Sequence, residues 1–99
     1  MSTAALLRIN APGPGQTPVT AGAASSAANA IPSGATKLWL KATAKAHIRF
    51  GDSSVGAATP NDQYLTADQD YVLDLLSGIT HFRAIRGDTA DATITWVAL

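Results

Sequence analysis

Residues 36–52 read TKLWLKATAKAHIRFGD and carry the clearest structural signal in this chain. Apolar side chains occupy every second position along it: Leu38, Leu40, Ala42, Ala46, Ile48 and Phe50. Because successive side chains of a β-strand point to opposite faces, a period of two predicts strands with one buried face. We therefore predict two strands, 37–43 and 46–50, joined near Ala44 and Lys45 as a hairpin.

The opposite positions of these two strands form a basic surface with one large aromatic ring. Its members are Lys37, Trp39, Lys41, His47 and Arg49. If the hairpin forms, all five side chains share one face, and an aromatic among cations suits a protein interface or a carbohydrate contact. The five are candidate interface residues. The alternative is that Trp39 lies in a second layer of the core.

The rest of the chain also divides into short strands separated by turn residues. Residues 19–31 are rich in small side chains and predict a strand-like segment or two short strands. Four further strands are predicted at 63–67, 70–75, 80–86 and 92–99. Seven or eight short strands with regular turns indicate an all-β fold, an antiparallel β-sandwich of jelly-roll-like type. We expect the last strand to lie inside a sheet, since an apolar free edge promotes aggregation.

The N-terminal part of the chain has a different character. Residues 1–18 predict an arm and a Pro/Gly linker, because APGPGQTP forms neither helix nor central strand. The sandwich domain is predicted at 19–99. Leu6 and Leu7 are adjacent and cannot share one strand face, so one of them is expected to meet a partner or the far side of the sandwich. Together with Ile9 they complete the candidate interface. The alternative is a surface loop with a frayed terminus.

Composition limits the classes of function. The formal net charge is zero and charged residues make up 14% of the chain, which favours association and argues against nucleic-acid binding. There is no cysteine, so neither a disulfide framework nor a thiolate nucleophile is available. The N-terminus has no basic segment followed by an apolar run, so we expect neither a signal peptide nor a membrane span.

Side chains that support catalysis are present but not in a recognisable arrangement. Ser, His and Asp occur without a nucleophile elbow. His47 and His81 lie mid-strand beside arginines, which is typical of surface histidines, and a metal site built from them is the minor alternative. Asp68, Asp70 and Asp74 lack the ligand pattern of a calcium loop. We expect a protein that is not an enzyme, with no catalytic residues, no cofactor and no metal site.

Several phrases resemble a group of small virion proteins of tailed bacteriophages. They are His47-Ile48-Arg49-Phe50-Gly51, the segment from Asp62 to Ala67, the turn at Gly78, and the strand from Phe82 to Arg86. The resemblance covers about residues 20–99 and excludes the Ala/Gly/Pro-rich N-terminal part. It implies a β-sandwich structural protein that decorates or cements a capsid shell.

This resemblance implies partners and a location. The expected partners are the major capsid protein or other virion proteins, and further copies of the chain in a homo-oligomer, with a trimer favoured. The expected location is the phage particle, after synthesis in the host cytoplasm. One alternative is a tail, collar or fibre-base subunit. Another is a carbohydrate-binding sandwich that exposes Trp39, Trp96 or Tyr64 to sugar rings.

Overall fold

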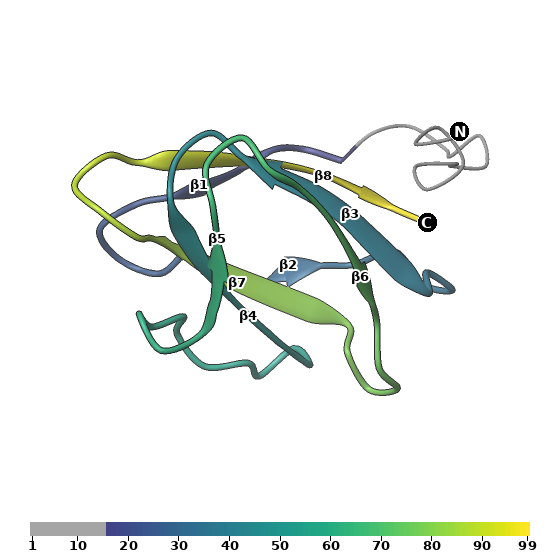
Figure 1. The fold of residues 1–99 in the computed structure, drawn as a ribbon. Helices are drawn as coiled ribbons and strands as arrows, with labels where there is room; N and C mark the ends of the chain where they lie inside the picture. Colours follow the sequence, from purple (N-terminus) through teal and green to yellow (C-terminus); the bar gives the residue numbers. More distant parts are fainter. Residues whose placement is uncertain (1–15) are drawn as a thin grey trace, which may run out of the picture.

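The computed structural model of the protein describes residues 16–99, which form two packed antiparallel sheets (Figure 1). Sheet A has the order β1-β8-β3-β6 and sheet B has the order β2-β7-β4-β5. The predicted all-β sandwich is confirmed. The predicted arm residues Leu6, Leu7 and Ile9 lie outside the described residues. The strands are β1 (Val19–Ala21), β2 (Asn29–Ala30), β3 (Lys37–Ala42), β4 (Ala46–Gly51), β5 (Gln63–Leu65), β6 (Asp70–Asp74), β7 (His81–Arg86) and β8 (Ala92–Ala98).

The strand order is that of a jelly roll, a long hairpin rolled on itself. β1 pairs with β8, β2 with β7, β3 with β6 and β4 with β5, as they would in one hairpin. Rolling then adds the pairs β3·β8 and β4·β7, which hold each sheet together. The last strand is thus paired on both sides, by β1 and β3, as the sequence predicts.

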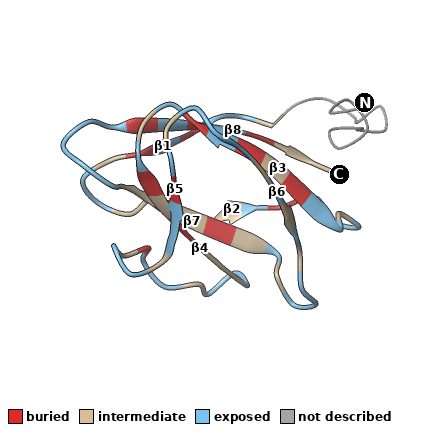
Figure 2. Ribbon diagram, viewed as in Figure 1, coloured by how far each residue is buried: buried red, intermediate tan, exposed pale blue. Residues whose placement is uncertain are grey.

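The core lies between the sheets and consists of the side chains that alternate inward. Leu38, Leu40 and Ala42 of β3 are fully buried, as are Ile94 of β8 and Phe82 of β7. The ring of Phe82 meets Trp96 edge-on, with 5.0 Å between centroids, and lies 6.1 Å from Phe50. Figure 2 shows the same alternation as red segments along the central strands.

The predicted hairpin between residues 37–43 and 46–50 is wrong. β3 belongs to sheet A and β4 to sheet B. Residues 43–45 carry the chain from one sheet to the other, anchored where Thr43 N donates to Thr93 O and Gly87 N donates to Lys45 O. Apolar residues on the even positions of both strands are buried in either arrangement. They lie on one face of a hairpin, or on the two facing sides of an arch, so alternation alone does not distinguish these arrangements.

Candidate protein-interaction surface

The outer face of sheet A carries a short row of apolar side chains. Trp39 of β3 has Val72 of β6 and Val97 of β8 as its register partners. Cross-strand neighbours on one face of a sheet lie about 5 Å apart, so these three side chains are contiguous. Trp39 and Val97 are half-buried and Val72 is 44% exposed. We call Trp39, Val72 and Val97 the Trp39 row.

Charged and hydroxyl side chains surround this row. On one side Lys37 Nζ lies 2.7 Å from Asp74 Oδ1. On the other side Lys41 is in register with Asp70 and Thr95. An apolar centre with a polar rim is the usual anatomy of a protein interface. Lys37–Asp74 is an exposed pair, so we expect it to influence partner choice more than stability.

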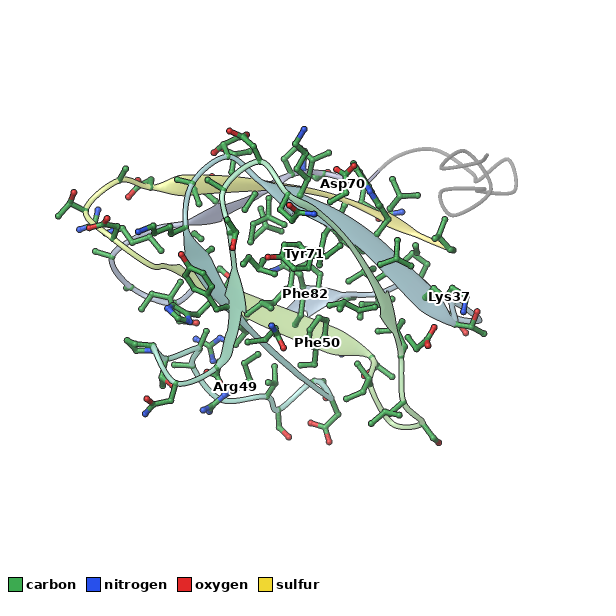
Figure 3. All side chains as sticks on the ribbon, in the orientation of Figure 1. Lys37, Arg49, Phe50, Asp70, Tyr71 and Phe82 are labelled. Atoms are coloured by element: carbon green, nitrogen blue, oxygen red, sulfur yellow. The ribbon has the colours of Figure 1, made fainter. Side chains whose placement is uncertain are left out.

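The five predicted basic-surface residues do not form one face, because β3 and β4 lie in different sheets. Lys37, Trp39 and Lys41 lie on the outer face of sheet A, whereas His47 and Arg49 lie on the outer face of sheet B. Figure 3 shows Lys37 and Arg49 at well-separated places on the molecule. The prediction of a single basic surface is therefore wrong, and the same hairpin error is its cause.

Arg49 and His47 hold the loop at residues 52–62, which connects β4 and β5. Arg49 Nε lies 3.0 Å from both carboxylate oxygens of Asp62. Asp62 Oδ2 also accepts hydrogen bonds from Thr59 N (2.7 Å) and Thr59 Oγ1 (3.1 Å). His47 Nδ1 lies 3.1 Å from Asp62 O, and its ring is 5.3 Å from that of Tyr64. Arg49 and His47 are thus engaged within the chain.

Arg83 attaches the same loop to a second point of sheet B. Its Nε donates to Ser26 O (2.7 Å) and its Nη1 donates to Val55 O (3.2 Å). Ala58 N donates to Ser25 Oγ (2.9 Å), and Ala58 is 4% exposed. The sequence did not predict that Asp62 and Arg83 hold this loop. The 52–62 loop packs against sheet B, while no described segment is attached in this way to the Trp39 row.

Burial raises the pKa of Asp62, but the hydrogen bonds from Thr59 and Arg49 outweigh this effect and hold the pKa below its ordinary value of 3.8. The ionised carboxylate therefore stabilises the folded loop fully above pH 3.8. This contribution is lost as the pH falls through the lowered pKa.

We expect the 52–62 loop to open at acid pH before the sandwich unfolds. Hydrogen exchange at the Thr59 amide, corrected for its intrinsic rate, should accelerate as the pH falls below 3.8. Asp62→Asn should make this amide exchange rapidly at every pH. Asp52→Asn is the matched control: Asp52 is exposed, and a hydrogen bond from Ser54 lowers its pKa. If Asp52→Asn and Asp62→Asn have equal effects on Thr59, the assigned role of Asp62 is wrong.

One end of the sandwich has a cleft of about 270 Å³ between two turns. It is lined by residues 31–36, which precede β3, and residues 75–80, which follow β6. Its lining contains apolar, glycine and hydroxyl side chains and no ionisable one. Gly34 and Gly78 have φ values of 88° and 92°, which only glycine adopts without strain, so both turns depend on these residues.

The aromatic rings and the His and Asp side chains considered from the sequence do not come together into a sugar platform or a metal site within residues 16–99. Trp96, one of three rings considered for a sugar platform, is 4% exposed, so it offers no such surface. Tyr64 and Trp39 lie on different sheets. Over residues 16–99 no three His or Asp side chains come together in a way that could hold a metal ion. The same residues contain no helix long and apolar enough to cross a membrane.

Comparison with known proteins adds no relative: no family model, curated protein or solved structure matches this chain.

Proposed function

We propose that this protein is a non-enzymatic structural subunit of a bacteriophage particle, a decoration or cement protein that stabilises the capsid through protein contacts. The observation that carries the proposal is the Trp39 row on the outer face of sheet A. The sandwich leaves an aromatic and two valines there, while its own loop packs against sheet B. Jelly-roll domains also occur among capsid proteins, and this analogy of fold supports the proposal.

The proposed work is mechanical. A standard interface buries about 800 Å² on each partner, which is a substantial share of a chain of this size. Many copies bound to one shell reinforce each other, because each contact raises the local concentration for the next. The near-neutral, weakly charged surface is compatible with this crowding. The proposed partners are the major capsid protein or other virion proteins, and further copies of the chain in a trimer or another closed homo-oligomer.

The test is to purify phage particles from a culture that produces this protein and to separate heads from tails. The amount of the chain in each fraction is then measured by mass spectrometry. We expect many copies per head and few per tail. Enrichment in tails would replace the decoration role by the tail, collar or fibre-base alternative. Absence from both fractions would reject a virion role.

A further inference from the structure

β6 leaves one side of its backbone open at the edge of sheet A. It is the terminal strand of the sheet and pairs with β3 alone among residues 16–99. Leu75 N donates to Thr36 O (2.9 Å), so by alternation the peptide groups of 71 and 73 also face β3. The backbone N–H and C=O groups of Asp70, Val72 and Asp74 point away from β3, toward the open edge of the sheet. Of these, Asp70 O lies 3.5 Å from Gln69 Nε2.

The inward side of this edge is apolar and only partly covered. Tyr71, Leu73 and Leu75 pack against the core but are only partly buried, in contrast to the fully buried Leu38, Leu40 and Ala42 of β3. Figure 2 shows β6 without a buried residue, and Figure 3 shows Tyr71 above Phe82 and Phe50 between the sheets. Across the gap, β5 pairs with β4 only from Ala46 to Ile48, so it stops short of Phe50. The inward-facing side chains at this edge are therefore less completely covered than those of β3.

The outward side of the edge is acidic. Asp74 is paired with Lys37, whereas Asp70 takes part in no ion pair within the described chain. Antiparallel pairing of two β6 strands about Val72 would place Asp70 opposite Asp74 twice, which like charges disfavour. The edge thus selects a strand that alternates apolar, basic, apolar.

This chain contains such a segment, Leu7-Arg8-Ile9. We propose that Leu7-Arg8-Ile9 of a second copy of the chain adds to β6 as a further strand of sheet A. With Arg8 opposite Val72, its guanidinium lies diagonal to Asp70 and Asp74 on the outer face. Leu7 and Ile9 then point inward and cover the partly exposed side chains of Tyr71 and Leu73. The inference rests on the proposed self-association and supplies its contact.

The position of β1 favours a second copy over the same chain. Trp96 Nε1 donates to Thr17 O (3.1 Å), so the chain enters at the β1 edge of sheet A, opposite β6. A strand beyond β6 would lie four spacings away, about 19 Å. Residues 10–16 span about 23 Å when fully extended, so a link within one chain would have only about 4 Å of slack. A second copy has no such limit, and a head-to-tail contact of this kind forms a ring when the rotation between successive copies closes.

Sedimentation equilibrium of the full chain tests the contact from both sides. We expect wild type to form a closed oligomer and Ile9→Ser to weaken association at least about tenfold. Leu6→Ser is the control, because in a strand Leu6 lies on the face opposite to Leu7 and Ile9. This variant should associate as wild type does. Val72→Pro should also abolish association, because it removes an outward N–H without disturbing the bonds to β3. Val72→Thr keeps that N–H and is the matched control.

Two further experiments, mixing of two variants and exchange of two opposite charges, distinguish binding to a second copy from binding within the same chain. Ile9→Ser retains a functional β6 and Val72→Pro retains a functional N-terminal segment, so an equimolar mixture should form a one-to-one dimer. A mixture that stays monomeric would overturn the proposal, and binding of the segment within its own chain would appear as a monomeric wild type. Arg8→Asp and Asp70→Arg should each weaken association, and the double variant should restore it.

The outcomes distinguish this inference from the function it rests on. A wild-type chain that stays monomeric overturns the self-association and this contact together, without bearing on whether the protein is found in phage heads. A wild-type oligomer that is insensitive to Ile9→Ser and Val72→Pro overturns this contact alone.

Discussion

Phe82→Ala is expected to reduce the free energy of unfolding by about 3–5 kcal/mol, because it removes a fully buried ring at the centre of the sandwich. The ring of Phe82, on sheet B, meets the ring of Trp96 on sheet A edge-on. It also lies 6.1 Å from the ring of Phe50, its register partner in sheet B. No small rearrangement fills this space, because β7 and β8, which carry Phe82 and Trp96, are each paired with strands on both sides. A single domain is stable by only about 5–15 kcal/mol, so the variant should be close to unfolding at ambient temperature.

Urea denaturation at a concentration where the chain is monomeric measures this loss. Phe82→Leu retains most of the buried volume and should cost less than about 2 kcal/mol. Ile85→Ala, on the same strand but facing outward and half-buried, should cost about 1 kcal/mol. If Ile85→Ala destabilises the protein as much as Phe82→Ala, the core does not lie where the sandwich places it.

Trp39→Ala is expected to weaken the proposed binding to the phage head at least about 30-fold, equivalent to about 2 kcal/mol, while leaving the sandwich folded. Trp39 is half-buried on the outer face, between Val72 and Val97, and contributes little to the inner core. Its ring supplies the largest apolar area of the Trp39 row, and large aromatics at the centre of an interface carry most of the binding energy.

Co-sedimentation of the purified protein with heads that lack it measures this binding, and thermal unfolding measures the fold. Tyr64→Ala is the matched control, because Tyr64 is an aromatic residue 40% exposed on the other sheet. It should bind as wild type does. A Trp39→Ala chain that melts early, but whose folded fraction binds normally, would place Trp39 in the core and contradict the proposed surface.

Alternation of apolar residues was sufficient to predict the strands. In residues 70–75 the alternation places Tyr71, Leu73 and Leu75 on one side, and all three pack against the core. In the last strand the same alternation places Ile94 and Trp96 on one face, and both are buried. Residues 19–31, for which the sequence left open one strand-like segment or two short strands, contain the two short strands β1 and β2. Side-chain parity within a strand is local, so the sequence expresses it directly.

Pairing between strands could not be predicted in the same way. Residues 43–45 are short enough for a hairpin, and the parity of Ala42 and Ala46 allows either a hairpin or an arch between sheets. The arch is selected by distant segments: β8 and β6 pair with β3, while β7 and β5 pair with β4. The separation of Lys41 from His47 follows from these pairings.

The surface was predicted in part for the same reason. Trp39 was recognised because it breaks a run of basic residues, but Val72 and Val97 are ordinary strand residues in sequence. They become significant only when the register places them beside Trp39. Arg49 and Arg83 are likewise brought opposite each other by the register of β4 and β7, and the 52–62 loop that they hold has no periodic signal of its own.

By itself, the sequence determined that this chain forms short amphipathic strands, which of their side chains are buried, and that its weakly charged surface favours association. The tertiary structure alone decided which strands become neighbours, which outer face the chain's own loop packs against, and which edge remains open. The reason is that burial depends on the alternation of nearby residues, whereas a surface or an edge is assembled from strands that are far apart in the chain and meet only when the long hairpin rolls up.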